Sequence, residues 1–330
     1  MSGEFIAHGA TRIHSWTRLR STVSAHTAEV PLAQYVDWRA GDEVLLSPTA
    51  YFNEVGGVWS NKKTTSGSSD EILTIASVRN ATDATTHAVY SILTLTRPAN
   101  HTHLCTTKHG ETFCGAVGLM TRNIRFQSRD SETPGVSSYG FGANLHIFDL
   151  IPKTGNAAQR RGYAYLNGVM FKNFGKINSD RYAIQFQYTD YQHPASTITN
   201  CAFNAGYSLA ARASHTMNFT FTNNVASGNW GGGVFVTDSN LNFEVSNNLI
   251  VGTRQLPSTL LSSYPWLRPI AGITVHSPHG VVMNNLAAGS EGEGFGKSFY
   301  FYFCLVSCQH FGHDFLEFAH VLIMCLQFYI

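Results

Sequence analysis

A short repeat in the second half of the chain limits its fold more than any other feature. Each copy places Gly or Asn at its third position, next to apolar and Thr/Asn residues. The central copies are 23 and 24 residues apart, and the outer ones are separated by 32 and 37 residues. The third positions are Gly168 in LNGV, Asn200 in ITNC, Asn223 in FTNN, Asn247 in VSNN and Asn284 in VMNN.

A period of about 20–25 residues is the length of one coil of a parallel β-helix, with three short strands and three turns. Asparagine suits the turns because it tolerates a left-handed backbone. Its amide can also bond the equivalent asparagine of the next coil, about 4.8 Å away. We therefore predict an all-β fold with a right-handed parallel β-helix over residues 131–296. Its structural asparagine ladder is predicted to be Asn200, Asn223, Asn247 and Asn284.

A β-sandwich is the rival fold for this region, but it would need hairpins with two-residue turns such as Asn-Gly. The repeat does not supply them.

Residues 1–130 form a second, β-rich region. The segments 71–78 (EILTIASV) and 90–98 (YSILTLTRP) alternate apolar and polar residues with period 2, as half-buried strands do. Residues 36–49 (VDWRAGDEVLLSPT) combine a Gly-Asp turn with a β-rich run. We predict a partial N-terminal β domain here.

The segment 297–330 breaks the pattern, because it is apolar and lacks the asparagine turns. It has the length of a membrane span, but acidic and histidine side chains in its middle oppose that interpretation. The alternative is a foreign C-terminal sequence that does not pack with the fold. A membrane contact is otherwise expected only through missing parts of a longer parent protein.

The charge balance excludes several partners. The chain has 22 basic and 21 acidic side chains, which gives no electrostatic case for nucleic acid. GEGFGKS (292–298) resembles a phosphate loop, but Glu291 stands where the motif needs glycine. We therefore expect no nucleotide, no cofactor and no metal, since acidic side chains such as Asp42 and Glu43 lack the spacing of a calcium site.

Cysteines and glycosylation sequons bear on the compartment. Cys105 and Cys114 flank a short polar stretch, and they form either a disulfide, if the protein is secreted, or two free thiols. Asn80, Asn100 and Asn218 stand in N-x-S/T sequons, which fit a glycosylated extracellular protein. The N-terminal residues do not have the pattern of a signal peptide, so an export signal would lie outside this sequence.

Four stretches together resemble a known family across roughly residues 3–296. WTRL (16–19) with 36–49, and AVGLMTRNI (116–124), are similar to the end of an eight-glycine domain. DRYAIQFQ (180–187) and NNLAAGSEGEGF (284–295) are similar to stretches of the β-helix that follows it. The family includes fibrocystin, fibrocystin-L and the cell-migration-inducing and transmembrane hyaluronidases. The resemblance implies a cell-surface or extracellular parent protein.

The same resemblance points to candidate site residues. Family members typically carry histidines at the positions of Gln185, Gln187 and Arg212, whereas Asp238 matches an acidic family position. Glutamine hydrogen-bonds sugar hydroxyls but does not shuttle protons. These four residues either line one polar groove for a polysaccharide or are ordinary solvated coil residues, and His276 is a further candidate ligand.

Three functional hypotheses follow. The first is a non-catalytic extracellular module that is structural or binds carbohydrate, with hyaluronan as a candidate partner. The second is a hyaluronan-type depolymerase with Asp238 as a weak catalytic candidate, although one carboxylate lacks an acid/base partner. The third is a truncated gene product without an independent function. The histidine replacements favour a chain that is not an enzyme.

Overall fold

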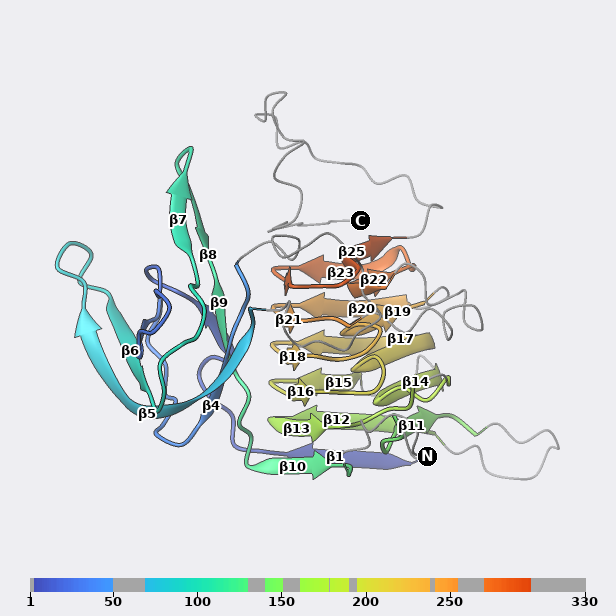
Figure 1. The fold of residues 1–330 in the computed structure, drawn as a ribbon. Coiled ribbons are helices and arrows are strands. Elements are labelled where there is room, and N and C mark those ends of the chain that lie inside the picture. The colour runs from blue at the N-terminus through green and yellow to red at the C-terminus, as the bar shows by residue number, and fades with distance from the viewer. Residues whose placement is uncertain are drawn as a thin grey trace.

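The computed structural model describes residues 3–49, 69–129, 140–150, 161–177, 179–189, 195–237, 241–254 and 270–297. In this part of the chain all regular elements are strands, and they form a right-handed parallel β-helix beside an antiparallel domain (Figure 1). The predicted fold class is therefore confirmed.

Three parallel sheets wind around one apolar core. Strands that are one coil apart pair in register, so each sheet is a stack of equivalent strands. β17 (Ala211–Thr222) belongs to two sheets because it bends around one corner. Sheet 1 contains β1 (Glu4–His8), β12 (Tyr163–Asn167), β15 (Ser196–Thr199), the second half of β17, β20 (Leu241–Ser246) and β23 (His279–Met283).

The other two sheets complete each coil. Sheet 2 contains β10 (Ile124–Gln127), β13 (Val169–Lys172), β16 (Ala202–Asn204), β18 (Val225–Ser227), β21 (Leu249–Val251) and β24 (Leu286–Ala288). Sheet 3 contains β11 (Leu145–Phe148), β14 (Ile184–Thr189), the first half of β17, β19 (Val234–Val236), β22 (Ala271–Val275) and β25 (Glu293–Lys297).

Side chains alternate between the core and the outer surface, because strand residues have period 2. The inward columns are aliphatic or aromatic. Phe126, Phe171 and Phe203 stack from coil to coil in sheet 2, with ring centroids 5.5 and 5.3 Å apart. These columns exclude water along the axis and hold the coils in register.

The left-handed corner between sheets 1 and 2 carries the repeat found in the sequence. Gly168, Asn200, Asn223, Asn247 and Asn284 occupy equivalent positions, with φ between 51° and 66°. The backbone N–H groups of the first four donate to the coil that follows, as Asn200 does to the Thr222 carbonyl at 3.2 Å. The four asparagines therefore stand in one column.

The hydrogen-bonded side-chain ladder, however, lies one residue later than predicted. Asn248 Nδ2 donates to Asn285 Oδ1 at 2.9 Å, and Asn224 Nδ2 donates to Asn248 Oδ1 at 3.1 Å. These three side chains are buried, whereas the neighbouring Asn223, Asn247 and Asn284 set the turn through their left-handed backbone. The first asparagine of each Asn-Asn pair thus makes the bend and the second points inward.

Cys201 occupies the ladder position of its own coil. Its backbone N–H donates to Asn224 Oδ1 at 2.9 Å. Burial raises the pKa of its thiol to about 11, so the group stays protonated and serves as a small core side chain.

The antiparallel domain is formed by β2 (Trp16–Arg18), β3 (Glu29–Pro31), β4 (Glu43–Leu46), β5 (Glu71–Thr82), β6 (Val89–Leu95) and β9 (Ala116–Leu119). Its chain boundaries differ from the predicted domain 1–130. β1 precedes this domain and β10 follows it, yet both belong to the first coil of the β-helix. Hydrophobic patterning could not show that β1 belongs to the β-helix, because the strand that pairs with it, β12, lies far away in the sequence.

The domain packs against the outer face of sheet 2 (Figure 1). Leu45, Ala116 and Met120 meet an apolar column of the β-helix. Gly118 is needed for this close approach, since a Cβ there would lie 2.8 Å from Val225 Cγ1. The β-helix column consists of Met170, Ala202, Val225, Leu249 and Leu286.

Polar side chains of the domain also bind the left-handed corner. Arg122 Nε donates to the Asn200 carbonyl at 2.5 Å, and Trp16 Nε1 donates to the Asn247 carbonyl at 2.7 Å. Burial lowers the pKa of Arg122 to about 10, and its remaining donors reach the Leu119 and Thr121 carbonyls. Side chains of the antiparallel domain thus donate hydrogen bonds to backbone carbonyls at this corner.

Candidate functional site: a polar outer face on sheet 3

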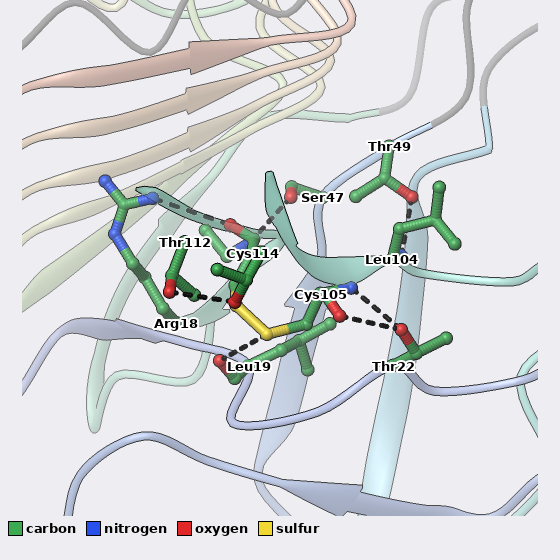
Figure 2. Close-up of a disulfide and its surroundings, with 11 residues drawn as sticks. Arg18, Leu19, Thr22, Ser47, Thr49, Leu104, Cys105, Thr112 and Cys114 are labelled. Carbon is green, nitrogen blue, oxygen red and sulfur yellow. Dashed lines mark hydrogen bonds between the residues drawn. A yellow bond between two sulfur atoms is a disulfide. The ribbon is translucent and has the colours of Figure 1, made fainter. Parts of the chain in front are cut away.

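A disulfide closes the hairpin of β7 (Cys105–Lys108) and β8 (Glu111–Cys114), which projects from the antiparallel domain (Figure 1). Cys105 and Cys114 are partners at the base of this hairpin, next to the Leu19 carbonyl and Thr22 (Figure 2). A crosslink over nine residues contributes about 2–3 kcal/mol through the unfolded chain. The disulfide is therefore a structural crosslink in the domain that covers sheet 2.

The outer face of sheet 3 gathers the candidate ligand residues. The register aligns His146 with Gln185 and Gln185 with Arg212, so these side chains point outward from three successive coils. Gln187 lies two residues further along β14 on the same face, and Gln185 Nε2 donates to Gln187 Oε1 at 3.4 Å. We call the set His146, Gln185, Gln187, Arg212, Phe235 and His276 the polar face.

Arg212 is the central charge of the polar face. Its NH1 donates to the Tyr182 hydroxyl at 3.2 Å, and its guanidinium carbon lies 5.0 Å from the Tyr182 ring centroid and 5.8 Å from that of Phe235. Nε is buried without a hydrogen-bond partner, and no carboxylate pairs with Arg212 among the described residues. A partly buried cation held only by aromatic rings and one hydroxyl retains capacity for an anion.

The histidines stand at the two ends of this face. Burial lowers the pKa of His146 below its ordinary value, and its hydrogen bond with Gln187 opposes that lowering. At the other end, the His276 ring packs edge-on against Phe235, with centroids 4.9 Å apart. His146, Gln187, Arg212 and His276 are half-buried, whereas Gln185 and Phe235 are buried beneath this face at 5% and 6% exposed.

The structure brings together four of the five predicted ligand residues, namely Gln185, Gln187, Arg212 and His276. Asp238, the fifth, lies outside the described residues. Sequence reasoning missed His146 and Phe235, because a strand position on an outer face has no local signal. Their alignment with Gln185 and Arg212 depends on which residues of successive coils pair with one another. The sequence of the first coils does not show that pairing.

The sequon asparagines lie in different settings. Asn80 and Asn100 are exposed in the antiparallel domain, where Asn80 Oδ1 accepts a bond from Ser91 at 3.0 Å. Asn218 is half-buried, and its amide oxygen accepts a hydrogen bond from Asn242. Glycosylation at these three positions stays a prediction.

In the described ranges, no group of three or more His, Cys, Asp or Glu side chains is arranged to hold a metal ion. Those ranges also contain no helix with the length and apolarity of a membrane span. The segment 298–330, discussed above as a membrane candidate, lies outside them.

Fold and site together define a parallel β-helix protein that carries an antiparallel domain on sheet 2 and the polar face on sheet 3. No family model matches the chain. Its curated homologues are fibrocystins and G8 domain proteins. It is 28% identical to human fibrocystin-L over 318 residues and 26% identical to dog fibrocystin over 295 residues. A G8 domain-containing protein of Dictyostelium discoideum is 26% identical over 232 residues.

The chain spans only a small part of the length of these relatives. The alignments include 90% and 89% of this chain but only 7% of fibrocystin-L and 6% of fibrocystin, and the Dictyostelium match includes 68% of this chain and 16% of that protein. Among solved structures, the chain aligns with the Gp54 tailspike of Acinetobacter baumannii bacteriophage AP22 at 12% identity and a TM-score of 0.22, over 90% of this chain and 55% of that one.

Proposed function

We propose that this chain is an extracellular, non-catalytic β-helix module that binds an acidic polysaccharide through the polar face. The observation that carries the proposal is Arg212, whose guanidinium lies near two aromatic rings and has no carboxylate partner among the described residues. A sugar carboxylate would supply the missing acceptor in a charge-assisted hydrogen bond. Gln187 beside it is half-buried and offers its amide to sugar hydroxyls, while the buried Gln185 holds that amide in place.

The extracellular part of the proposal is supported by the disulfide between Cys105 and Cys114, since such bonds persist in oxidising compartments. Homology to fibrocystin and fibrocystin-L points the same way. Hyaluronan, which alternates uronic acid and N-acetylhexosamine, is the polysaccharide we propose to test first.

Binding is tested by calorimetry with hyaluronan oligosaccharides, with neutral chitin oligosaccharides as the reference ligand. We expect wild-type protein to bind only the acidic series. Arg212→Gln should weaken that binding about 10- to 100-fold, because a hydrogen bond to a charged group contributes about 1.5–3 kcal/mol. Arg79→Gln is the matched control, since Arg79 is an exposed arginine of the antiparallel domain paired with Glu29.

Two outcomes contradict the proposal. Equal affinity for the acidic and neutral series would remove the role of Arg212 as an anion site. Shortening of hyaluronan after incubation, measured by size-exclusion chromatography, would replace a binding module by a depolymerase and would make Asp238→Asn the next variant.

A further inference from the structure

The left-handed corners of the β-helix show one chemical exception. At the corner between sheets 1 and 2 the left-handed residues are glycine or asparagine. At the corner after sheet 2 they are Asn173, Ala205, Gly228, Gly252 and Gly289. Small residues are expected there, since a left-handed backbone costs other residues about 1–2 kcal/mol.

The corner between sheets 3 and 1 has left-handed asparagines, Asn218 and Asn242, and it also carries two aromatic residues. Tyr188 has φ 53° and His215 has φ 50°. They occupy equivalent places in successive coils, because Gln187 pairs with Ser214 and Thr189 with Thr216 on either side. Residues held in such a conformation are concentrated at functional sites, where the cost is compensated by a role.

Neither ring is used in the core. Tyr188 is 57% exposed and His215 is also exposed, and their rings stack on each other with centroids 4.9 Å apart. The Ser214 hydroxyl lies 3.0 Å from His215 Nδ1 and fixes the orientation of that ring. The result is a rigid aromatic platform on the surface.

This platform continues the polar face. Tyr188 directly follows Gln187, and His215 lies three residues after Arg212 on β17. Three strand residues extend about 10 Å, which is more than one sugar ring. A polysaccharide that binds Arg212 and runs along the strands therefore reaches the platform only with another sugar of its chain.

We propose that Tyr188 and His215 form a second sugar subsite, in which the Tyr188 ring stacks on the apolar face of a sugar two units away from the sugar at Arg212. Aromatic rings suit this task because they combine an apolar face with a polar edge. The inference rests on the proposed function, and it adds that affinity depends on oligosaccharide length.

The test uses Tyr188→Asn and two hyaluronan probes, a disaccharide and a decasaccharide. Asparagine prefers the left-handed backbone, so the variant should be at least as stable as the wild type. We expect decasaccharide affinity to fall about 5-fold, from the loss of one aromatic contact, and disaccharide affinity to stay unchanged. Calorimetry gives the affinities and thermal unfolding gives the stability.

Tyr165→Thr is the matched control. Tyr165 also contacts a histidine ring, that of His8, in a tilted arrangement with ring centroids 4.6 Å apart, but it lies mid-strand on sheet 1. Threonine occurs at the same position in the next two coils, as Thr197 and Thr220. This control should bind both probes like the wild type.

Three results would overturn the inference. If Tyr188→Asn binds the decasaccharide as tightly as the wild type while Arg212→Gln does not, the second subsite is absent and the proposed function stands. If Tyr188→Asn loses stability and weakens both probes equally, the platform is structural. If wild-type protein binds neither probe, the proposed function fails together with the subsite.

Discussion

Two outer faces of the same β-helix have opposite chemistry. Sheet 2 presents an apolar column that includes Val225, Leu249 and Leu286, and the antiparallel domain covers it. Sheet 3 presents Gln185, Gln187 and Arg212 from strands of the same type. The inward columns of both sheets are apolar. Thus the inward residues determine the fold, whereas the outward residues determine what each face contacts.

The largest effect should come from the covered face. Leu249→Ala removes a fully buried side chain from the contact between the two domains. We expect a loss of about 3 kcal/mol in the free energy of unfolding, from lost burial and the cavity left behind. Urea unfolding measures this loss.

Gln187→Ala on sheet 3 is the counterpart of that change and should cost less than about 0.5 kcal/mol, as for most surface substitutions. Equal losses at the two positions would mean that the faces do not differ in the way described.

The next effect separates the two asparagine columns at one corner. Asn248→Ala removes the acceptor of the buried Asn224 backbone N–H and the side-chain donor to the Phe221 carbonyl. The expected loss is about 2 kcal/mol, the cost of unpaired buried polar groups. Asn247→Gly should change stability by only a few tenths of a kcal/mol, because glycine accepts φ 52° readily. A larger loss of stability for Asn247→Gly would mean that the side-chain ladder runs through Asn247, as the sequence predicted.

The third prediction concerns how the stability of the antiparallel domain depends on pH. Burial alone would raise the pKa of Glu71, but hydrogen bonds from the Asn100 and His101 amides and from His103 outweigh burial and lower it. A carboxylate with a lowered folded-state pKa stabilises the fold above its unfolded pKa of about 4.3. That contribution is lost as pH falls through the lowered folded-state pKa.

Glu71→Gln should therefore be less stable than the wild type at pH 7 and approach it at pH 3. Chemical unfolding across this range gives both curves. Parallel curves would show that the carboxylate does not contribute through its charge.

The smallest effect is expected on the polar face itself. Arg212→Met replaces a partly buried cation, which has no carboxylate partner in the part of the chain that the structure describes, by an apolar side chain of similar length. Such replacements are often neutral or stabilising, and we expect a gain of about 0.5 kcal/mol. A clear loss of stability would make Arg212 a structural residue of sheet 3. The midpoint of thermal unfolding decides between the two outcomes.

The sequence predicted the β-helix because its turn chemistry repeats in every coil. It did not distinguish Asn247 from Asn248, since both asparagines look equivalent until one takes a left-handed backbone and the other points inward. The polar face was predicted in part, through family positions at Gln185, Gln187 and Arg212. His146 and Tyr188 could not be predicted, because their neighbours depend on which coil lies next to β14.

The position of the antiparallel domain within the first coil has a consequence for synthesis of the chain. β1 pairs with β12, and the contact from Glu4 to Tyr163 closes a loop of roughly 160 residues. At about 5–20 residues per second, the ribosome needs about 8–30 s to make that partner available. The antiparallel domain, whose strands pair only with one another, can fold during this interval. It then presents β10 next to β1, so that the first coil starts from a surface that is already folded.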